Sequence, residues 1–383
     1  MMGEFSVFRI DQQPGIRNHV VILSLNSFCN RAVELIATAV RGTLPLVHPF
    51  GRNEIGIYRE RLERTIEGVV LNPNVGAVLL VGYEPESTQA LLDKVRHKTS
   101  KPVDSVLVLE SGTMSAVHAG ADKAIWMMLG ASEARRNPTS DFEGFIFGVK
   151  CGGSDATSGV ASNGAIGEAV DRILERGGTA IFSETTEILG AEHILARRAV
   201  NETVAQKIYD AVKANEKTAM DAGIDLLGIN PVPDNVRGGI TTIEEKSLGA
   251  IMKTGTFPIQ DVLSYGQRPD KPGLYFMDSP SAASEVVTGM SACGAQMILF
   301  STGSCNPVGN PISPVLKVTS NPRTVARMRQ HLDVDISDVL TKGQSIRDAG
   351  DCIVEAVKAI SDGRLTMAEI TGHLEFAPIP VGL

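Results

Sequence analysis

The feature that most constrains the fold is a series of short apolar segments, each followed by a stretch with helical periodicity. Three such pairs occupy the first third of the chain, at 20–25 and 31–40, 76–82 and 87–97, and 105–109 and 114–129. Segments that are apolar at every position, rather than at every second one, are typical of strands buried on both faces of a parallel sheet. We therefore predict a doubly wound α/β domain over 15–132, with its ligands beyond the carboxyl ends of the strands.

The same alternation resumes after a polar segment at 133–141, which we interpret as a linker. Apolar segments at 144–149, 179–183, 274–277, 297–300 and 315–318 alternate with helical patterns at 191–222, 241–251 and 346–369. This pattern predicts a second, larger α/β domain over 142–383. A chain of 383 residues is long enough for two or three domains of ordinary size.

The composition narrows the functional class. The chain carries 36 Lys and Arg against 44 Asp and Glu, a formal charge of −8, which argues against nucleic acid or a membrane surface as a partner. No apolar stretch reaches the roughly 18 residues of a membrane span, and the first residues do not form a signal peptide. The 5 cysteines include no C-x-x-C pair, as is typical of a reducing compartment. We therefore expect a cytoplasmic enzyme.

A segment rich in glycine and small polar residues follows the predicted strand at 144–149. It runs Lys150-Cys-Gly-Gly-Ser-Asp-Ala-Thr-Ser158 and opens a helix. Adjacent glycines let successive amides point at one spot, and a helix N-terminus adds partial positive charge, so this segment is suited to a carboxylate or phosphate. The residues expected to bind this anion are Lys150, Gly152, Gly153, Ser154, Asp155 and Ser158. The alternative is a tight turn in which Ser154 or Asp155 is only the helix N-cap.

Two acidic residues follow the next predicted strand. Glu184 comes directly after the segment 179–183. A strand–helix–strand crossover makes the two strands parallel, so Glu184 should lie at the same sheet edge as Cys151. A carboxylate in this place can act as a base or as a metal ligand. Glu187 is instead interpreted as an exposed N-cap residue.

Further candidates come from two other regions. Gly239 belongs to a second glycine-rich turn, from which Lys246 and Lys253 could polarise a substrate carboxylate. For either lysine taken alone, a solvated side chain is the simpler interpretation. In the first domain, His48 and Glu84 lie at predicted strand ends, where a titratable side chain is well placed for chemistry.

Together these segments resemble the altronate/galactarate dehydratase family, which also contains the large subunit of sulfolactate sulfo-lyase. The blocks that carry the resemblance are Lys150-Cys-Gly-Gly-Ser-Asp155, Ser158-Gly-Val-Ala-Ser-Asn163, Ile243-Glu-Glu-Lys246 and Lys253-Thr-Gly255. The resemblance implies a hydro-lyase that converts a sugar acid such as altronate or galactarate to a 2-keto-3-deoxy acid with a divalent metal, most often Fe²⁺. Because the chain begins directly at the large catalytic region, the resemblance also implies a separate small subunit of about 90 residues. We further expect an oligomer.

The chain departs from this family at two positions. Family dehydratases usually have Gly-Cys-Gly where this chain has Gly51-Arg52-Asn53, and Gly-Cys-Glu where it has Gly82-Tyr83-Glu84. In the arrangement that we expect, Cys151 and Glu84 hold the metal. Arg52 adds a fixed positive charge, which repels a cation and attracts a substrate anion.

The chemistry of such a lyase assigns roles to the remaining candidates. Removing a hydrogen beside a carboxylate requires a base and a positive group on the developing enediolate. We assign proton transfer to His48 and Glu184, and positive charge to Arg52 and to Lys246 or Lys253. Two alternatives remain open: a (2R)-sulfolactate sulfo-lyase that releases sulfite, and a metal-free homologue that binds an acid without converting it.

Overall fold

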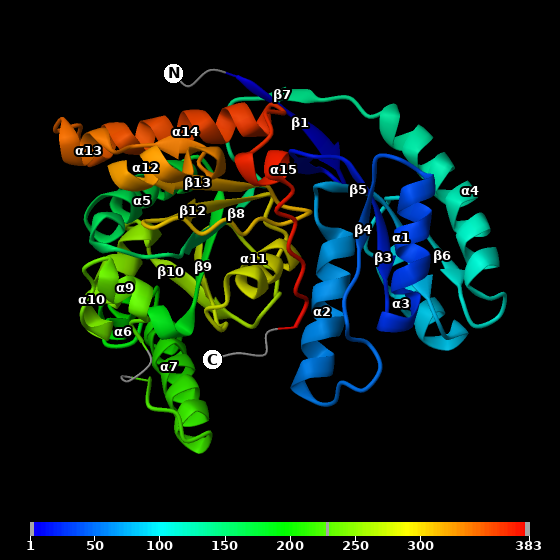
Figure 1. Cartoon of the computed structure of the whole chain (residues 1–383), viewed down its shortest axis with the longest axis horizontal. Helices are drawn as coiled ribbons and strands as arrows, with labels where there is room; N and C mark the ends of the chain where they lie inside the picture. The colour runs from blue at the N-terminus through cyan, green and yellow to red at the C-terminus, as the bar shows by residue number, and fades with distance from the viewer. Residues whose placement is uncertain (1–3, 227–229, 380–383) are drawn as a thin grey trace.

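The first domain is built on a sheet of four parallel strands, at the right of Figure 1. The structure is a computed structural model that describes residues 4–226 and 230–379. The strands are β3 (His19–Ser24), β4 (Thr43–Leu46), β5 (Val75–Gly82) and β6 (Val103–Leu107), in the order β4-β3-β5-β6. Two helices pack on each face: α1 (Asn30–Ala39) and α4 (Thr113–Ser132) on one, α2 (Ile57–Leu71) and α3 (Pro85–Arg96) on the other. The predicted doubly wound parallel sheet is confirmed.

The second, larger domain contains a seven-stranded sheet in which every neighbouring pair is parallel. Its order is β10 (Ile259–Leu263), β11 (Leu274–Met277), β9 (Thr179–Ser183), β8 (Ile146–Cys151), β12 (Met297–Ser301), β13 (Val315–Thr319) and β14 (Val334–Asp335). One face is covered by α5 (Asn163–Leu174), α7 (Glu202–Asp221) and α14 (Ile346–Ser361), and the other by α11 (Ala283–Ala292). The predicted second α/β domain is confirmed in class.

Several helices are shorter than the periodicity predicts. The pattern at 191–222 forms two helices, α6 (Glu192–Ala196) and α7, because Asn201 caps α7 by accepting a hydrogen bond from the Val204 amide at 2.9 Å. The pattern at 346–369 likewise divides into α14 and α15 (Met367–Thr371). Within the described residues, the second domain also contains α9 (Pro233–Arg237), α10 (Ile243–Ile251), α12 (Pro322–Met328) and α13 (Asp338–Thr341). None of the helices in the described part of the chain is long and apolar enough to cross a membrane.

A small antiparallel sheet, absent from the sequence prediction, lies between the two domains at the top of Figure 1. It consists of β1 (Phe5–Ile10), β2 (Gln13–Gly15) and β7 (Asn137–Thr139), so the segment interpreted as a linker contains a strand. Such short strands give little periodic signal, and their hydrogen bonds come from partners distant in the sequence.

Buried hydrogen bonds fasten the two domains together. The Asn72 side-chain amide donates to the carbonyl oxygens of Ser291 and Ala295 at 2.8 and 2.9 Å, at the end of α11. The C-terminal segment runs between α11 and α2, as Figure 1 shows, and Phe376 and Ile379 pack into the core of the first domain. The second domain is therefore held against the first by both backbone and side-chain contacts.

Candidate active site

The candidate site lies at the carboxyl edge of the seven-stranded sheet. Strand β8 ends with Lys150 and Cys151, and its parallel neighbour β9 is followed by Glu184 and the 3₁₀ turn η3 (Thr185–Glu187). Helix α10 contributes Lys246, and the turn η4 (Met252–Thr254) contributes Lys253. We call these six side chains the lysine–carboxylate cluster: Lys150, Cys151, Glu184, Glu187, Lys246 and Lys253.

The Lys253 ammonium group lies at the centre of this cluster. Its Nζ atom donates to Cys151 Sγ at 3.1 Å and to Glu187 Oε2 at 3.4 Å, and lies 4.0 Å from Glu184 Oε2. The Cys151 thiol donates to Glu187 Oε2 at 3.0 Å. All four of these side chains are almost completely buried, which strengthens each contact because water does not screen it.

Two further lysines close the cluster from either side. Lys150 Nζ forms an ion pair with Glu184 Oε1 and donates to the Cys151 carbonyl oxygen at 2.8 Å. Lys246 Nζ lies 3.8 Å from Glu187 Oε1 and donates to Asn230 Oδ1 at 2.9 Å. Lys246 has the most exposed side chain of the three lysines, at 10%, so it borders solvent.

The backbone at Glu184 is held in an unusual conformation. Its φ angle is +81°, in the left-handed region that favours glycine. The neighbouring backbone fixes this turn, since the Thr185 amide donates to the Ser279 carbonyl oxygen at 3.0 Å and Ser183 Oγ donates to the Met277 carbonyl oxygen at 2.8 Å. A strained, well-anchored residue that aims a carboxylate into a buried cluster is typical of a functional site.

Electrostatics separate the two carboxylates. Burial and the negative charge of Glu187 raise the pKa of Glu184 to about 7. Burial also acts to raise the pKa of Glu187, but the positive charges of Lys253, Lys246 and Lys150 outweigh it and lower that pKa to about 2. Glu187 is therefore ionised at neutral pH, whereas Glu184 can exchange a proton there.

The cysteine and its lysine partner also have shifted pKa values. Burial, followed by the charge of Glu187, raises the pKa of the Cys151 thiol to about 12. Burial acts to lower the pKa of Lys253, but the acidic groups around it outweigh burial and raise it. At neutral pH the cluster thus contains a neutral thiol beside an ammonium group.

Three members of the cluster form a group that could hold a metal ion. One ligand atom each from Cys151, Glu184 and Glu187 lies within 4.8 Å of the others, and all three residues are buried. A thiolate with two carboxylates is a donor set that several divalent metals accept. However, the Lys253 ammonium group lies among these same atoms, so the arrangement does not fit a divalent ion while Lys253 keeps its position.

The glycine-rich loop after β8 is mainly a structural turn. Asp155 Oδ1 accepts from the Ser158 amide at 2.9 Å and Asp155 Oδ2 accepts from Asn321 at 2.8 Å, as the alternative N-cap interpretation predicts. The Gly152 amide donates to the Ser301 carbonyl oxygen at 3.0 Å, so it is not available to an anion. Ser154 Oγ is buried and has no hydrogen-bond partner within the described residues.

In the second glycine-rich turn, the amide of Gly239 already has a backbone partner. The Gly239 amide donates to the Val236 carbonyl oxygen at 3.0 Å, and φ at Gly239 is +92°. The turn therefore ends α9 and packs beside the glycine-rich loop, where the Ala156 amide donates to the Gly238 carbonyl oxygen at 2.9 Å.

The candidates of the first domain lie apart from the lysine–carboxylate cluster. His48 is buried, with Nε2 at 2.9 Å from the Ser24 carbonyl oxygen and Nδ1 accepting from the Phe50 amide at 3.3 Å. Burial lowers the pKa of His48, so the imidazole is neutral and both ring nitrogens serve the backbone. In the described part of the chain, no hydrogen bond or ion pair joins His48 to the cluster.

Arg52 and Glu84 pair with each other. Arg52 donates to Glu84 Oε1 at 2.9 Å, and its guanidinium group lies 4.5 Å from the Phe28 ring centre and 5.6 Å from that of Tyr83. They line a cavity of about 470 Å³ beyond the carboxyl ends of β3, β4 and β5. The structure thus brings Cys151 together with Glu184 and Glu187, and not with Glu84, because Glu84 follows a strand of the other sheet.

Sequence reasoning missed Glu187. It is 4% exposed and contacts both Cys151 and Lys253, so its interpretation as an exposed N-cap is wrong. Its spacing from Glu184 was the available signal, since η3 places two carboxylates three residues apart on one turn. The burial of this turn depends on its contacts with α7 and α10, which a local pattern does not show.

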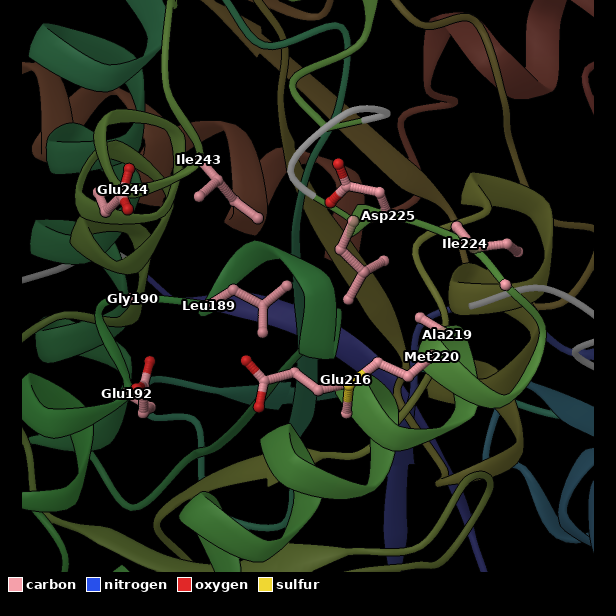
Figure 2. Close-up of a pocket in the computed structure, with 12 residues that line it drawn as sticks. Leu189, Gly190, Glu192, Glu216, Ala219, Met220, Ile224, Asp225, Ile243 and Glu244 are labelled. Carbon is pink, nitrogen blue, oxygen red and sulfur yellow. The ribbon is translucent and has the colours of Figure 1, made fainter.

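A larger cavity of about 740 Å³ is lined by residues of α6, α7 and α10 and by the segment between η3 and α6 (Figure 2). Figure 2 shows the carboxylates of Glu192, Glu216, Asp225 and Glu244 around it, with Leu189 and Ile243 on its walls. Four acidic groups repel an anion, so this cavity is unsuited to a carboxylic-acid substrate.

Comparison with known proteins places the chain in a family of lyases. Residues 142–383 match the family model "D-galactarate/Altronate dehydratase, C-terminal", and residues 8–132 match "D-galactarate dehydratase/Altronate hydrolase, second domain". The chain therefore belongs to the D-galactarate/altronate dehydratase family, as its sequence blocks predict, and is a lyase of this family.

Three relatives show where the chain stands within the family. It is 41% identical to the (2R)-sulfolactate sulfo-lyase subunit beta of Chromohalobacter salexigens, over 94% of this chain and 93% of the relative. It is 27% identical to the altronate dehydratase of Escherichia coli, over 98% of this chain and 77% of the relative. It is 31% identical to the altronate dehydratase of Bacillus subtilis, over 80% of this chain and 63% of the relative. The alignment with the sulfo-lyase subunit spans nearly all of both chains.

Proposed function

We propose that this chain is the catalytic subunit of a lyase that eliminates sulfite from a 2-hydroxy-3-sulfonate such as (2R)-sulfolactate, together with a separate small subunit. The observation that carries the proposal is the buried cluster, in which three lysines face two carboxylates and leave one positive charge in surplus. A fixed positive surplus shielded from water favours a small, strongly anionic substrate. The 41% identity to a sulfo-lyase beta subunit supports both the sulfonate and the partner subunit.

Glu184 is the group suited to move the proton. Its pKa of about 7 lets the acid and the carboxylate coexist near neutral pH. Glu184 Oε2 is buried and lacks a hydrogen-bond partner within the described residues, so it can accept the hydrogen from C2 of the substrate. The electron pair of the broken C2–H bond forms the C2–C3 double bond, while the C3–S bond breaks and sulfite leaves with its electrons. The resulting enol tautomerises to a 2-keto acid by losing its hydroxyl proton and taking a proton at C3.

The lysines stabilise the negative charge that develops on the substrate during this elimination. Lys150 and Lys253 lie at opposite oxygens of Glu184, so positive charge surrounds the base itself. Glu187 stays ionised and holds Lys253 and Lys246 in place. We derive no step through Fe²⁺, the ion that the resemblance implies, because Lys253 stands among the atoms that would bind it.

A hydro-lyase that dehydrates a sugar acid is the second candidate. The family match over 142–383 and the alignment with the altronate dehydratase of Escherichia coli, over 98% of this chain, favour it. The same cluster serves this reaction if the departing group is hydroxide, which then needs a proton from an acid.

A substrate panel on the full chain, alone and co-produced with its small subunit, separates these candidates. Equimolar sulfite and 2-keto acid from (2R)-sulfolactate would support the proposal. A 2-keto-3-deoxy acid from altronate or galactarate, without sulfite from sulfolactate, would transfer the assignment to the hydro-lyase. Thermal stabilisation by an acid without any product would favour a binding homologue.

A pair of variants tests the role of Glu184. The isosteric Glu184→Gln change should lower kcat by at least about 100-fold, because an amide cannot take the proton. The matched change Glu192→Gln lies in the acidic cavity of Figure 2 and should leave kcat unchanged. Undiminished turnover in the Glu184 variant would remove it from the mechanism.

A further inference from the structure

We propose that the Lys253 ammonium group takes the place of a divalent metal ion at Cys151, Glu184 and Glu187, so that ion and ammonium compete for the same three atoms. The Lys253 Nζ atom lies 3.1 Å from Cys151 Sγ, 3.4 Å from Glu187 Oε2 and 4.0 Å from Glu184 Oε2. These are the three residues that could hold a metal, with ligand atoms within 4.8 Å of one another. The inference concerns the cation of the site and does not depend on which acid is the substrate.

Coordination distances make the two occupants exclusive. Metal ions bind thiolate and carboxylate ligands at about 2.0–2.3 Å. An ion bound to all three side chains would therefore need the negative charge that the ammonium group now contacts at 3.1 Å on Cys151, 3.4 Å on Glu187 and 4.0 Å on Glu184. With the ion present, each ligand atom would turn its negative charge to the metal, and the ammonium group would lose all three partners.

The charge of the cluster also opposes a second cation. Two carboxylates already face three lysines, and the exposed fraction of the side chains does not exceed 10%. A divalent ion would raise the surplus from one positive charge to three, or to two if the thiol ionises. Unscreened positive charges at such distances repel strongly, because the buried site offers few counter-charges.

Lys253 cannot easily withdraw to make room for an ion. Its turn η4 lies against α5, where a side-chain carbon on Gly167 would come within 2.3 Å of the Met252 carbonyl oxygen. On the other side, Arg198 donates to Thr254 Oγ1 at 2.8 Å and fixes the next residue. The backbone of Lys253 is therefore clamped, and the stem of its side chain is 2% exposed.

Cobalt is a suitable probe, because Co²⁺ bound to a thiolate gives a near-ultraviolet charge-transfer band. The full-length protein, freed of metal with a chelator, is titrated with Co²⁺. The wild-type protein should show no such band at one equivalent. The Lys253→Met variant keeps the aliphatic part of the side chain and removes the charge. It should bind one equivalent of Co²⁺ and show the charge-transfer band. Its affinity for Co²⁺ should be at least about 100-fold higher than that of the wild-type protein. The matched Lys246→Met variant also removes one positive charge but leaves Lys253 in contact with the three side chains, so it should still show no band at one equivalent.

The identity of the ligand is checked with Cys151→Ser in the Lys253→Met background, which should abolish the band. A band at one equivalent in the wild-type protein that disappears in Cys151→Ser would overturn the proposal. So would a folded Lys253→Met variant, with wild-type circular dichroism, that binds no Co²⁺ at the cluster. If Lys253→Met does not fold, the wild-type titration decides alone, since a Cys151-dependent band refutes the proposal and its absence at saturating Co²⁺ supports it. These results differ from loss of the proposed function, which the substrate panel measures on product formation.

Discussion

Lys317 provides a test of the electrostatics of this sheet that is independent of activity. It lies on β13, fully buried, with its Nζ atom bonded to the Val308 carbonyl oxygen and 3.8 Å from the centre of the Phe300 ring. It forms no ion pair with a carboxylate of the described residues. Burial therefore lowers its pKa from 10.5 to about 7, although the charges of Cys305, Asp333 and Glu375 act to raise it.

This shift makes stability depend on pH in a defined direction. Between about pH 7 and 10.5 the unfolded chain carries a proton on Lys317 that the folded chain has lost, so the free energy of unfolding rises with pH in that window. The Lys317→Met variant lacks this contribution. From pH 7.5 to 9.5 the wild-type protein should therefore gain about 2.5 kcal/mol relative to the variant, from roughly 1.36 kcal/mol per pKa unit.

The assay is urea unfolding of both proteins at several pH values, followed by circular dichroism. The loss of the Val308 hydrogen bond costs about 1 kcal/mol at every pH, so only the change with pH is diagnostic. Lys342 is the matched control, because it is exposed and pairs with Asp338 at 3.1 Å, and Lys342→Met should follow the wild-type curve. A difference between wild type and Lys317→Met that does not vary with pH would refute the reasoning.

Three further predictions concern packing, ion pairing and turnover. The Glu369→Gln change should destabilise the protein by about 3 kcal/mol in urea unfolding, because it leaves the Arg17 guanidinium group, 2.8 Å away, buried without a counter-charge. Gly68→Ala should lower stability by about 2 kcal/mol in the same assay, since the new carbon would lie 2.2 Å from the Ala292 carbonyl oxygen at the domain interface. Glu187→Gln should lower kcat/KM for sulfite release by at least about 100-fold, because the lysines it holds lose their negative partner; a change below threefold in steady-state assays would contradict this role.

The strands were the most predictable part of the fold. The predicted segments 179–183 and 274–277 coincide with β9 and β11, because strands buried on both faces are apolar without interruption. Helix α2, which follows β4, was not predicted, because its first residues are rich in charge and face solvent. Its apolar residues face both the sheet and α11, a partner more than two hundred residues away in the sequence, which no local pattern can show.

The site was predictable in part for the same physical reason. Parallel neighbouring strands bring Cys151 and Glu184 to one edge, so a crossover rule predicts their proximity. Lys253 is 102 residues from Cys151, and its entry into the cluster depends on how η4 packs against α5. Burial, not residue type, distinguishes Lys253 from a solvated lysine, and burial is a property of the assembled fold.

The charge balance of the cluster connects this packing to the choice of substrate. When Glu184 is protonated, the three lysines face only Glu187, and the surplus rises from one positive charge to two. A dianion such as a carboxylate–sulfonate would balance both surplus positive charges, whereas a singly charged sugar acid would leave one of them unbalanced. A bound dianion would in turn favour the protonated form of Glu184, because a like charge beside a buried carboxylate raises its pKa. Each elimination in the proposed mechanism leaves its proton on Glu184 while the bound anions balance the surplus, and Glu184 must release that proton before it can act as the base again.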